Sequence, residues 1–159
     1  MKPIVLALML VCGWGCASER ADLVVVEKAK HQLSVYGKGR LLASFHAVFG
    51  SHPDGTKAME GDGRTPEGRY LLDAKKLDSA FYKAFHVSYP GPQDVERARM
   101  AGVSPGKDIM VHGQKNGLGW LAFISQRFNW TQGCIALTNE DMDALWSLVD
   151  VGTPIEIRP

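Results

Sequence analysis

Cysteine is scarce in this chain, and its distribution narrows the chemistry that the sequence supports. Cys12 and Cys16 lie in an N-terminal segment that we expect to be processed, which leaves Cys134 as the single cysteine of the remainder. A single cysteine cannot build a disulfide framework within one chain. Cys134 is therefore either a buried, inert side chain or a thiol kept for chemistry.

Strong charge of one sign and long hydrophobic runs are also missing. The formal net charge is +1 and no cluster of lysines and arginines stands out, so nothing in the sequence indicates a nucleic-acid partner. The apolar run at residues 4–11 is much shorter than the roughly 20 residues that a membrane-spanning helix needs. With 45% hydrophobic and 22% charged residues, the composition is typical of one globular domain.

The N-terminus has the pattern of an export signal. Lys2 precedes the apolar run, and the small residues Gly15 and Ala17 follow it, so we expect residues 1–17 to be a signal peptide. Cleavage before Cys16 would give a lipid-anchored protein, whereas cleavage after Ala17 would give a soluble exported one. The folded domain is then expected over residues 22–159.

The rest of the chain predicts a mainly β fold. The β-branched run at residues 23–26 is typical of a strand covered on both faces. Alternating apolar residues around the turn at residues 37–39 predict an antiparallel meander. Two short helices are expected, at residues 94–101 with Gly102 after the last turn, and at residues 139–149 with Thr138 or Asn139 as N-cap. Residues 51–68, rich in Gly, Pro and Asp, predict a long loop.

The surroundings of Cys134 favour the chemical interpretation. A distant histidine, His112, stands at the end of a predicted strand, and such a pair can form a thiolate–imidazolium nucleophile. Gly133, just before the cysteine, allows a tight turn that leaves backbone N–H groups free to hold an oxyanion. Together they predict acyl transfer.

Longer motifs resemble one known family. The motifs are Gly61-Asp62-Gly63-Arg64-Thr65-Pro66-Glu67-Gly68, Ser88-Tyr89-Pro90, Ile109-Met110-Val111-His112-Gly113, Thr131-Gln132-Gly133-Cys134-Ile135-Ala136-Leu137-Thr138-Asn139 and Gly152-Thr153-Pro154-Ile155-Glu156-Ile157. In content, order and spacing they resemble the L,D-transpeptidase catalytic domain (YkuD) family, in its Trp-Thr-x-Gly-Cys-Ile-Ala branch. The resemblance implies a β-sandwich with one or two short helices packed on it.

The same resemblance implies a function and a site. Cys134 would be the nucleophile and His112 its base, with the N–H groups of Gly133 and Cys134 holding the oxyanion and no cofactor required. Gln132 and Gly113 are further candidates for oxyanion or substrate contacts. The partners would be peptidoglycan stem peptides, and the location the periplasm or cell envelope, where the enzyme would cross-link or remodel the cell wall.

Two departures from the commoner family motif leave the acceptor open. Gln132 stands where that motif has a histidine, and Ala136 stands where it has an arginine. Glutamine can only hydrogen-bond, and alanine removes a charged contact. A hydrolytic L,D-carboxypeptidase or amidase is therefore an alternative. An alternative of another class is a catalytically silent cell-wall-binding domain.

Two further groups of residues, histidines and aromatic residues, carry weaker functional signals. The histidines at 46, 52 and 86 are potential metal ligands, and His52-Pro53-Asp54 has the spacing of a ligand pair. No third ligand has convincing spacing to that pair, so no metal site is predicted. The aromatic residues Trp120, Phe123, Phe128 and Trp130 are expected to cover the site or to pack a core, and the segment between His112 and Cys134 could form a lid.

Overall fold

The computed structural model describes residues 19–159, so the expected signal segment lies outside the described residues. Eight strands form one sheet in the order β3-β2-β1-β8-β4-β5-β6-β7. Their bounds are β1 Leu23–Glu27, β2 Gln32–Gly37, β3 Arg40–His46, β4 Gly68–Lys76, β5 Ala84–Val87, β6 Met110–His112, β7 Ile135–Ala136 and β8 Thr153–Arg158. The mainly β prediction is confirmed.

Strands from the two ends of the chain meet in the middle of the sheet. β1 pairs with β2 in antiparallel register and with the last strand, β8, in parallel register. Val24, Val25 and Val26 of β1 are all buried, as expected for a β-branched strand that has neighbours on both sides and cover on both faces. The first three strands form the predicted antiparallel meander.

The sheet curls, so that its two ends approach each other. The chain beyond β3 returns to the opposite edge, where Val48 bridges Ala136 of β7. The curled sheet encloses an apolar core that includes Leu33, Phe49, Leu72, Phe85, Val111, Ile135, Leu137, Met142, Leu145 and Ile155. The cysteine turn and the end of β6 lie at this closing edge of the sheet.

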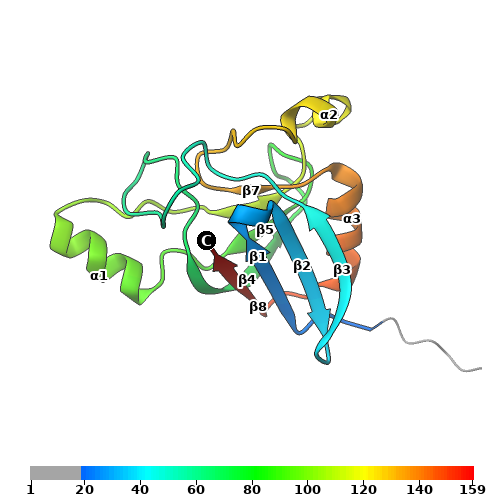
Figure 1. Cartoon of the computed structure of the whole chain (residues 1–159), viewed down its shortest axis with the longest axis horizontal. Coiled ribbons are helices and arrows are strands. Elements are labelled where there is room, and N and C mark those ends of the chain that lie inside the picture. The colour runs from blue at the N-terminus through cyan, green and yellow to red at the C-terminus, as the bar shows by residue number, and fades with distance from the viewer. Residues whose placement is uncertain (1–18) are drawn as a thin grey trace, which may run out of the picture.

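Helices cover part of the sheet and extend from it (Figure 1). α3 (Asn139–Leu148) begins at the N-cap Thr138, whose hydroxyl accepts from Asp141 N, and it buries Met142 and Leu145. α1 (Pro92–Ala101) ends at Gly102 in the left-handed conformation, as predicted. The short η1 (Lys28–Lys30), η2 (Gly119–Leu121) and α2 (Ala122–Ser125) complete the described elements, and α2 was not predicted.

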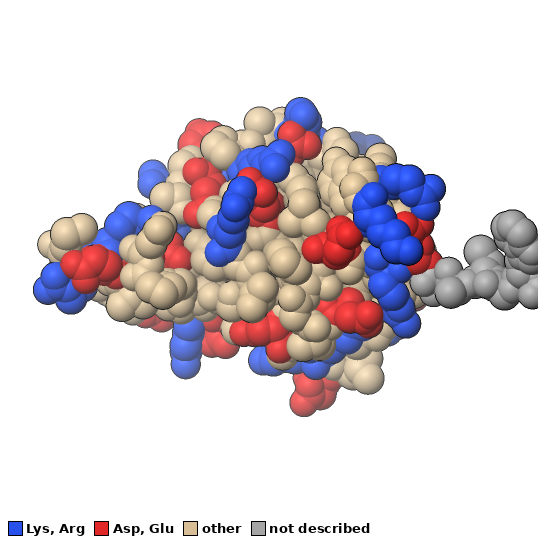
Figure 2. Space-filling view, turned by 90° about the horizontal axis from the view of Figure 1, so that it is seen from below, with Lys and Arg blue, Asp and Glu red and all other residues tan. Residues whose placement is uncertain are grey.

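Two observations concern the surface. Figure 2 shows Lys and Arg interspersed with Asp and Glu over the face in view. Within residues 19–159, no helix is both long enough and apolar enough to cross a membrane.

Candidate active site

The curled sheet places His112 at the end of β6 and Cys134 directly before the neighbouring strand β7. β6 and β7 are parallel, with Val111 opposite Ile135 and His112 opposite Ala136. Cys134 comes directly before β7, at the end from which β6 starts. Alternate residues of a strand share a face, so the histidine and the cysteine belong to the same face of this strand pair. The two predicted residues, which are far apart in sequence, are thus brought together.

The imidazole of His112 is held by its own backbone neighbourhood. Nδ1 lies 2.6 Å from the carbonyl oxygen of Gly113, so Nδ1 carries the proton and Nε2 keeps a lone pair. The N–H of Gly113 donates to Tyr82 O at 2.9 Å, so it is not free to bind substrate in this structure. The role that the structure supports for Gly113 is therefore orientation of the histidine.

Aromatic rings cover the histidine. The ring centroids of Phe81 and Trp130 lie 4.4 Å and 5.9 Å from that of His112, and His112 is 3% exposed. Burial lowers the pKa of the His112 imidazole, against the opposing effect of its hydrogen bond to Gly113. The histidine is therefore neutral near pH 7 and able to accept a proton.

The thiol of Cys134 is also neutral at rest. Its Sγ lies 3.8 Å from the carbonyl oxygen of Asp108, and no hydrogen bond among the described residues joins it to His112. Burial raises the pKa of the Cys134 thiol, and the backbone of Met110 and the positive charge of Lys57 lower it only in part. The unliganded site thus holds a thiol and an imidazole rather than a preformed ion pair.

The turn before Cys134 requires glycine. Gly133 has a φ of 124°, and a Cβ there would lie 2.5 Å from the carbonyl oxygen of Arg64. The hydroxyl of Thr131 accepts from Gly133 N at 3.1 Å and donates to Cys134 O at 2.7 Å. Thr131 lies within the motif around Cys134, but the sequence alone predicted no role for it. Its signal was local, since a threonine two residues before a glycine can close a turn with its own hydroxyl.

A pocket of about 240 Å³ opens beside the cysteine. Cys134 and the exposed Gln132 form part of its lining. The rest comes from two loops, which contribute Lys57, Glu60, Gly61, Gly106, Lys107, Asp108 and Ile109. The side chains that line the pocket carry both signs of charge, so it suits a charged or zwitterionic ligand.

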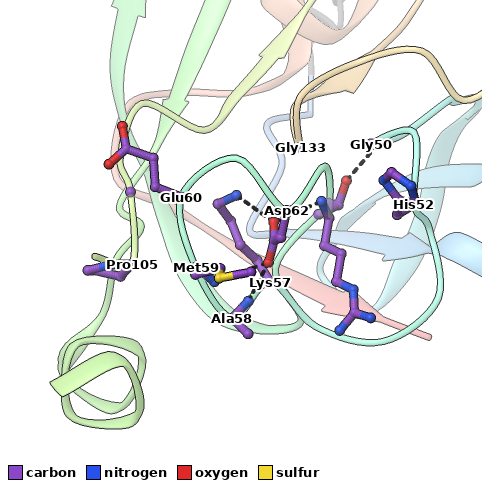
Figure 3. A network of polar contacts seen from close by, with 12 residues as sticks. Gly50, His52, Lys57, Ala58, Met59, Glu60, Asp62, Pro105 and Gly133 are labelled. Atoms are coloured by element: carbon purple, nitrogen blue, oxygen red, sulfur yellow. Dashed lines mark hydrogen bonds and ion pairs between the residues drawn. The ribbon is translucent and has the colours of Figure 1, made fainter. Parts of the chain in front are cut away.

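Lys57, one of the lining residues of this pocket, belongs to an ion pair that the sequence did not predict. Lys57 Nζ lies 2.8 Å from Asp62 Oδ1, and both side chains are almost entirely buried. Figure 3 shows the two pointing toward each other inside their loop, with Gly133 nearby. Asp62 also accepts from the backbone N–H groups of Ala58, Met59 and Arg64. A Gly-rich loop has no hydrophobic periodicity from which such a pair could be predicted.

The carboxylate of Asp62 is strongly stabilised in its charged form. Burial alone would raise its pKa, but the hydrogen bonds from Lys57 and from three backbone N–H groups lower the pKa of Asp62 to about 2. The loop therefore remains ionic at any physiological pH. Because Arg64 O packs against Gly133, this ionic loop also supports the cysteine turn.

The aromatic residues divide into two groups. Trp130 packs beside His112 as expected, whereas Trp120, Phe123 and Phe128 are 62–70% exposed. These three neither pack a core nor close over the site in this structure. Among residues 19–159, no group of three or more His, Cys, Asp or Glu side chains could hold a metal ion.

The comparisons with known proteins agree with this architecture. The profile of the YkuD family, the L,D-transpeptidase catalytic domain, matches residues 21–157. "Putative L,D-transpeptidase YafK" of Escherichia coli K12 is 29% identical over an alignment of 132 residues, which covers 79% of this chain and 46% of that protein. The chain thus spans about half the length of the curated relatives that it matches.

Two solved structures extend the comparison. The helical cell shape determining protein Pgp2 from Campylobacter jejuni is 25% identical with a TM-score of 0.66, covering 88% of this chain and 48% of that one. An L,D-transpeptidase from Mycobacterium smegmatis is 20% identical with a TM-score of 0.59, covering 87% and 59%, and shares the fold. With its profile match over residues 21–157, this chain belongs to the L,D-transpeptidase catalytic domain family.

Proposed function

We propose that this protein is a cysteine-dependent acyl-transfer enzyme that acts on peptidoglycan stem peptides. The observation that supports this most directly is the placement of His112 on β6 and of Cys134 directly before the adjacent strand β7, with the imidazole oriented by Gly113. Family membership supports the substrate class. The names of the relatives, an L,D-transpeptidase and a cell shape determining protein, are consistent with it.

The mechanism follows from the neutral state of the two groups. As the substrate carbonyl approaches, His112 Nε2 takes the proton of Cys134 Sγ, and sulfur bonds to the carbonyl carbon. The carbonyl electron pair moves to oxygen, and the Cys134 N–H holds that oxyanion. The Gly133 N–H joins it only after leaving the Thr131 hydroxyl that it binds at rest. Proton transfer on demand is typical of general-base catalysis, in which contacts tighten when substrate binds.

Collapse of this intermediate gives a thioester. The carbon–nitrogen bond breaks, the distal residue leaves as an amine, and it takes the proton that His112 carries. An amine acceptor then attacks the thioester with His112 as base, which yields a cross-link and returns the proton to the thiol. The donor carbonyl belongs to the L-centre of a diaminopimelate-type residue in this proposal.

Water is the competing acceptor, and hydrolysis is the second candidate function. Gln132 is exposed at the pocket and Ala136 is fully buried opposite His112, so neither position carries a cation that could hold an acceptor. The exposed aromatic residues of the segment at 118–128 also do not cover the pocket. Both observations favour access of water to the thioester.

The cellular placement belongs to the same proposal. An enzyme that acts on stem peptides works outside the cytoplasmic membrane, in the periplasm or cell envelope. The N-terminal segment would direct export, and Cys16 would carry the lipid if the lipoprotein route is used. Mass spectrometry of the mature N-terminus distinguishes the two processing routes.

The decisive experiment incubates the protein with a defined stem tetrapeptide muropeptide, with and without an amine acceptor, and identifies the products by mass spectrometry. Dimers or amine adducts indicate transfer, and shortened monomers indicate hydrolysis. Cys134→Ala and Cys134→Ser should both abolish turnover while remaining folded, since a serine hydroxyl is too weakly acidic for His112 to ionise. Wild-type protein without turnover and without labelling by a carbapenem would instead identify a silent cell-wall-binding domain.

A further inference from the structure

The ammonium group of Lys57 is the buried charge of the pocket. Its side chain is 4% exposed, and among the described residues it donates one hydrogen bond, to Asp62. An ammonium group has three N–H donors, so two remain without a partner in the described part of the chain. A buried cation with unused donors is costly unless a ligand or water completes its contacts.

The other charges of the pocket are less suited to bind a ligand. Lys107 is 80% exposed at its side chain and lies 3.9 Å from Asp108. Glu60 accepts from the Ser104 hydroxyl at 3.0 Å. The exposed charges are screened by water, whereas a buried charge acts at a lower effective dielectric. A bound anion would therefore interact more strongly with Lys57 than with the exposed charges of the pocket.

Lys57 also lies close enough to the reacting sulfur for its charge to act on it. Both residues line the same pocket, and the positive charge of Lys57 lowers the pKa of Cys134. Asp62 is turned toward the backbone N–H groups of its own loop. The pair thus presents its positive end to the cysteine.

We propose that Lys57 binds a free carboxylate of the substrate beside Cys134 and so selects acyl donors that carry an anionic group near the scissile carbonyl. This inference rests on the proposed function for the identity of the substrate. Lys57 supplies a cation from a loop that is distant from Cys134 in sequence, whereas Gln132 and Ala136 supply none. The loop at residues 57–65 thereby becomes a specificity element in addition to a support for the cysteine turn.

Alkylation of Cys134 tests this without any turnover. Iodoacetate and iodoacetamide both transfer a CH₂ group to the thiolate with loss of iodide, but only iodoacetate carries a carboxylate. For Lys57→Met, the ratio of the iodoacetate rate to the iodoacetamide rate should fall about tenfold relative to wild type, the order expected for a lost charged hydrogen bond. Lys107→Met is the matched control and should keep at least half of the wild-type ratio.

The folding of the variant must be separated from its chemistry. Lys57→Met leaves Asp62 buried without its cation, so the double variant Lys57→Met with Asp62→Asn removes both charges and should show the same loss of the ratio. A thermal melt by circular dichroism checks both proteins. An equal drop in both alkylation rates would overturn the proposal, because Lys57 would then act only on thiol ionisation.

Turnover provides the second measurement. The tetrapeptide with its free carboxylates is compared with the same peptide amidated at every free carboxyl group, including that of the diaminopimelate-type residue, and Lys57→Met should raise KM for the first and leave KM for the second unchanged. An equal effect on both peptides contradicts the inference while the proposed function stands. Wild-type protein inactive on both peptides contradicts the proposed function, and the alkylation ratio still decides the role of Lys57.

Discussion

The two sides of the pocket around Cys134 handle burial differently. On the strand side, His112 of β6 and the thiol of Cys134, directly before β7, are neutral groups, because burial disfavours the charged form of each. On the loop side, Lys57 and Asp62 are both charged and are buried as a pair. A buried neutral group needs no partner of opposite charge, whereas a buried charge must be hydrogen-bonded and paired to offset its loss of hydration.

Substitutions on the two sides should therefore have different effects on activity and stability. A substitution on the strand side should remove chemistry and leave the fold intact, since no charge is left unpaired. A substitution on the loop side should first cost stability, because it leaves one buried charge without its partner. Separate measurements of activity and stability therefore test whether the two sides differ in this way.

After removal of the nucleophile itself, the largest effect is expected from His112. Removing the general base by His112→Gln should lower kcat/KM by about 10²–10⁴, with a melting temperature close to wild type. In the wild type, activity should rise with pH as the imidazole loses its proton, at a pH below the usual histidine range because burial lowers the pKa of His112. A pH profile of kcat/KM that keeps this acid limb in His112→Gln would contradict the assignment.

Asp62 should show the opposite pattern. Asp62→Ala leaves Lys57 buried without its anion and removes the acceptor of three backbone N–H groups, so the free energy of unfolding should fall by about 3 kcal/mol. Asp62→Asn keeps an acceptor oxygen and should lose less. Urea unfolding of the two variants measures this. A change below about 0.5 kcal/mol in Asp62→Ala would show that the loop is not held by its ion pair.

Much of the strand side could be predicted from the sequence, because its signals are local. A β-branched run marks β1, and Thr138 marks the start of α3. The strand ending in His112 was also expected. The Gly-Cys turn was recognised because only glycine accepts the φ that the turn requires.

The loop side could not be predicted in the same way. The burial of Lys57 depends on the approach of residues 57–65 to the cysteine turn, and the contact of Arg64 O with Gly133 is a tertiary one. Similarly, the parallel pairing of β1 with β8 joins the two ends of the described chain. The exposure of Trp120, Phe123 and Phe128 also depends on which surfaces the fold leaves without a partner, and hydrophobicity alone predicts burial.

Thr131 connects the two sides, since its hydroxyl closes the turn that the loop supports. Thr131→Val keeps the shape but removes both hydrogen bonds of the hydroxyl, and kcat should fall about tenfold if these bonds order the turn. Thr131→Ser keeps the hydroxyl and is the matched control. A rise in kcat for Thr131→Val would show instead that the hydroxyl occupies an oxyanion donor that the reaction needs.

The smallest expected effect is a pH dependence that belongs to the loop side alone. The pKa of Asp62 lies near 2 in the folded protein, below its ordinary value of 3.8. A carboxylate with a lowered folded pKa stabilises the protein above the unfolded pKa, so this contribution is complete above about pH 5 and is lost as the pH falls toward 2. With solvent screening, the loss of unfolding free energy should be on the order of 1–2 kcal/mol.

Urea unfolding at several pH values measures this contribution, and the free energy of unfolding should fall less steeply with acid in Asp62→Asn than in wild type. Glu60→Gln, which neutralises a neighbouring carboxylate on the same loop, should keep the wild-type slope, and an equal flattening in both variants would mean that Asp62 has no special part in the acid response.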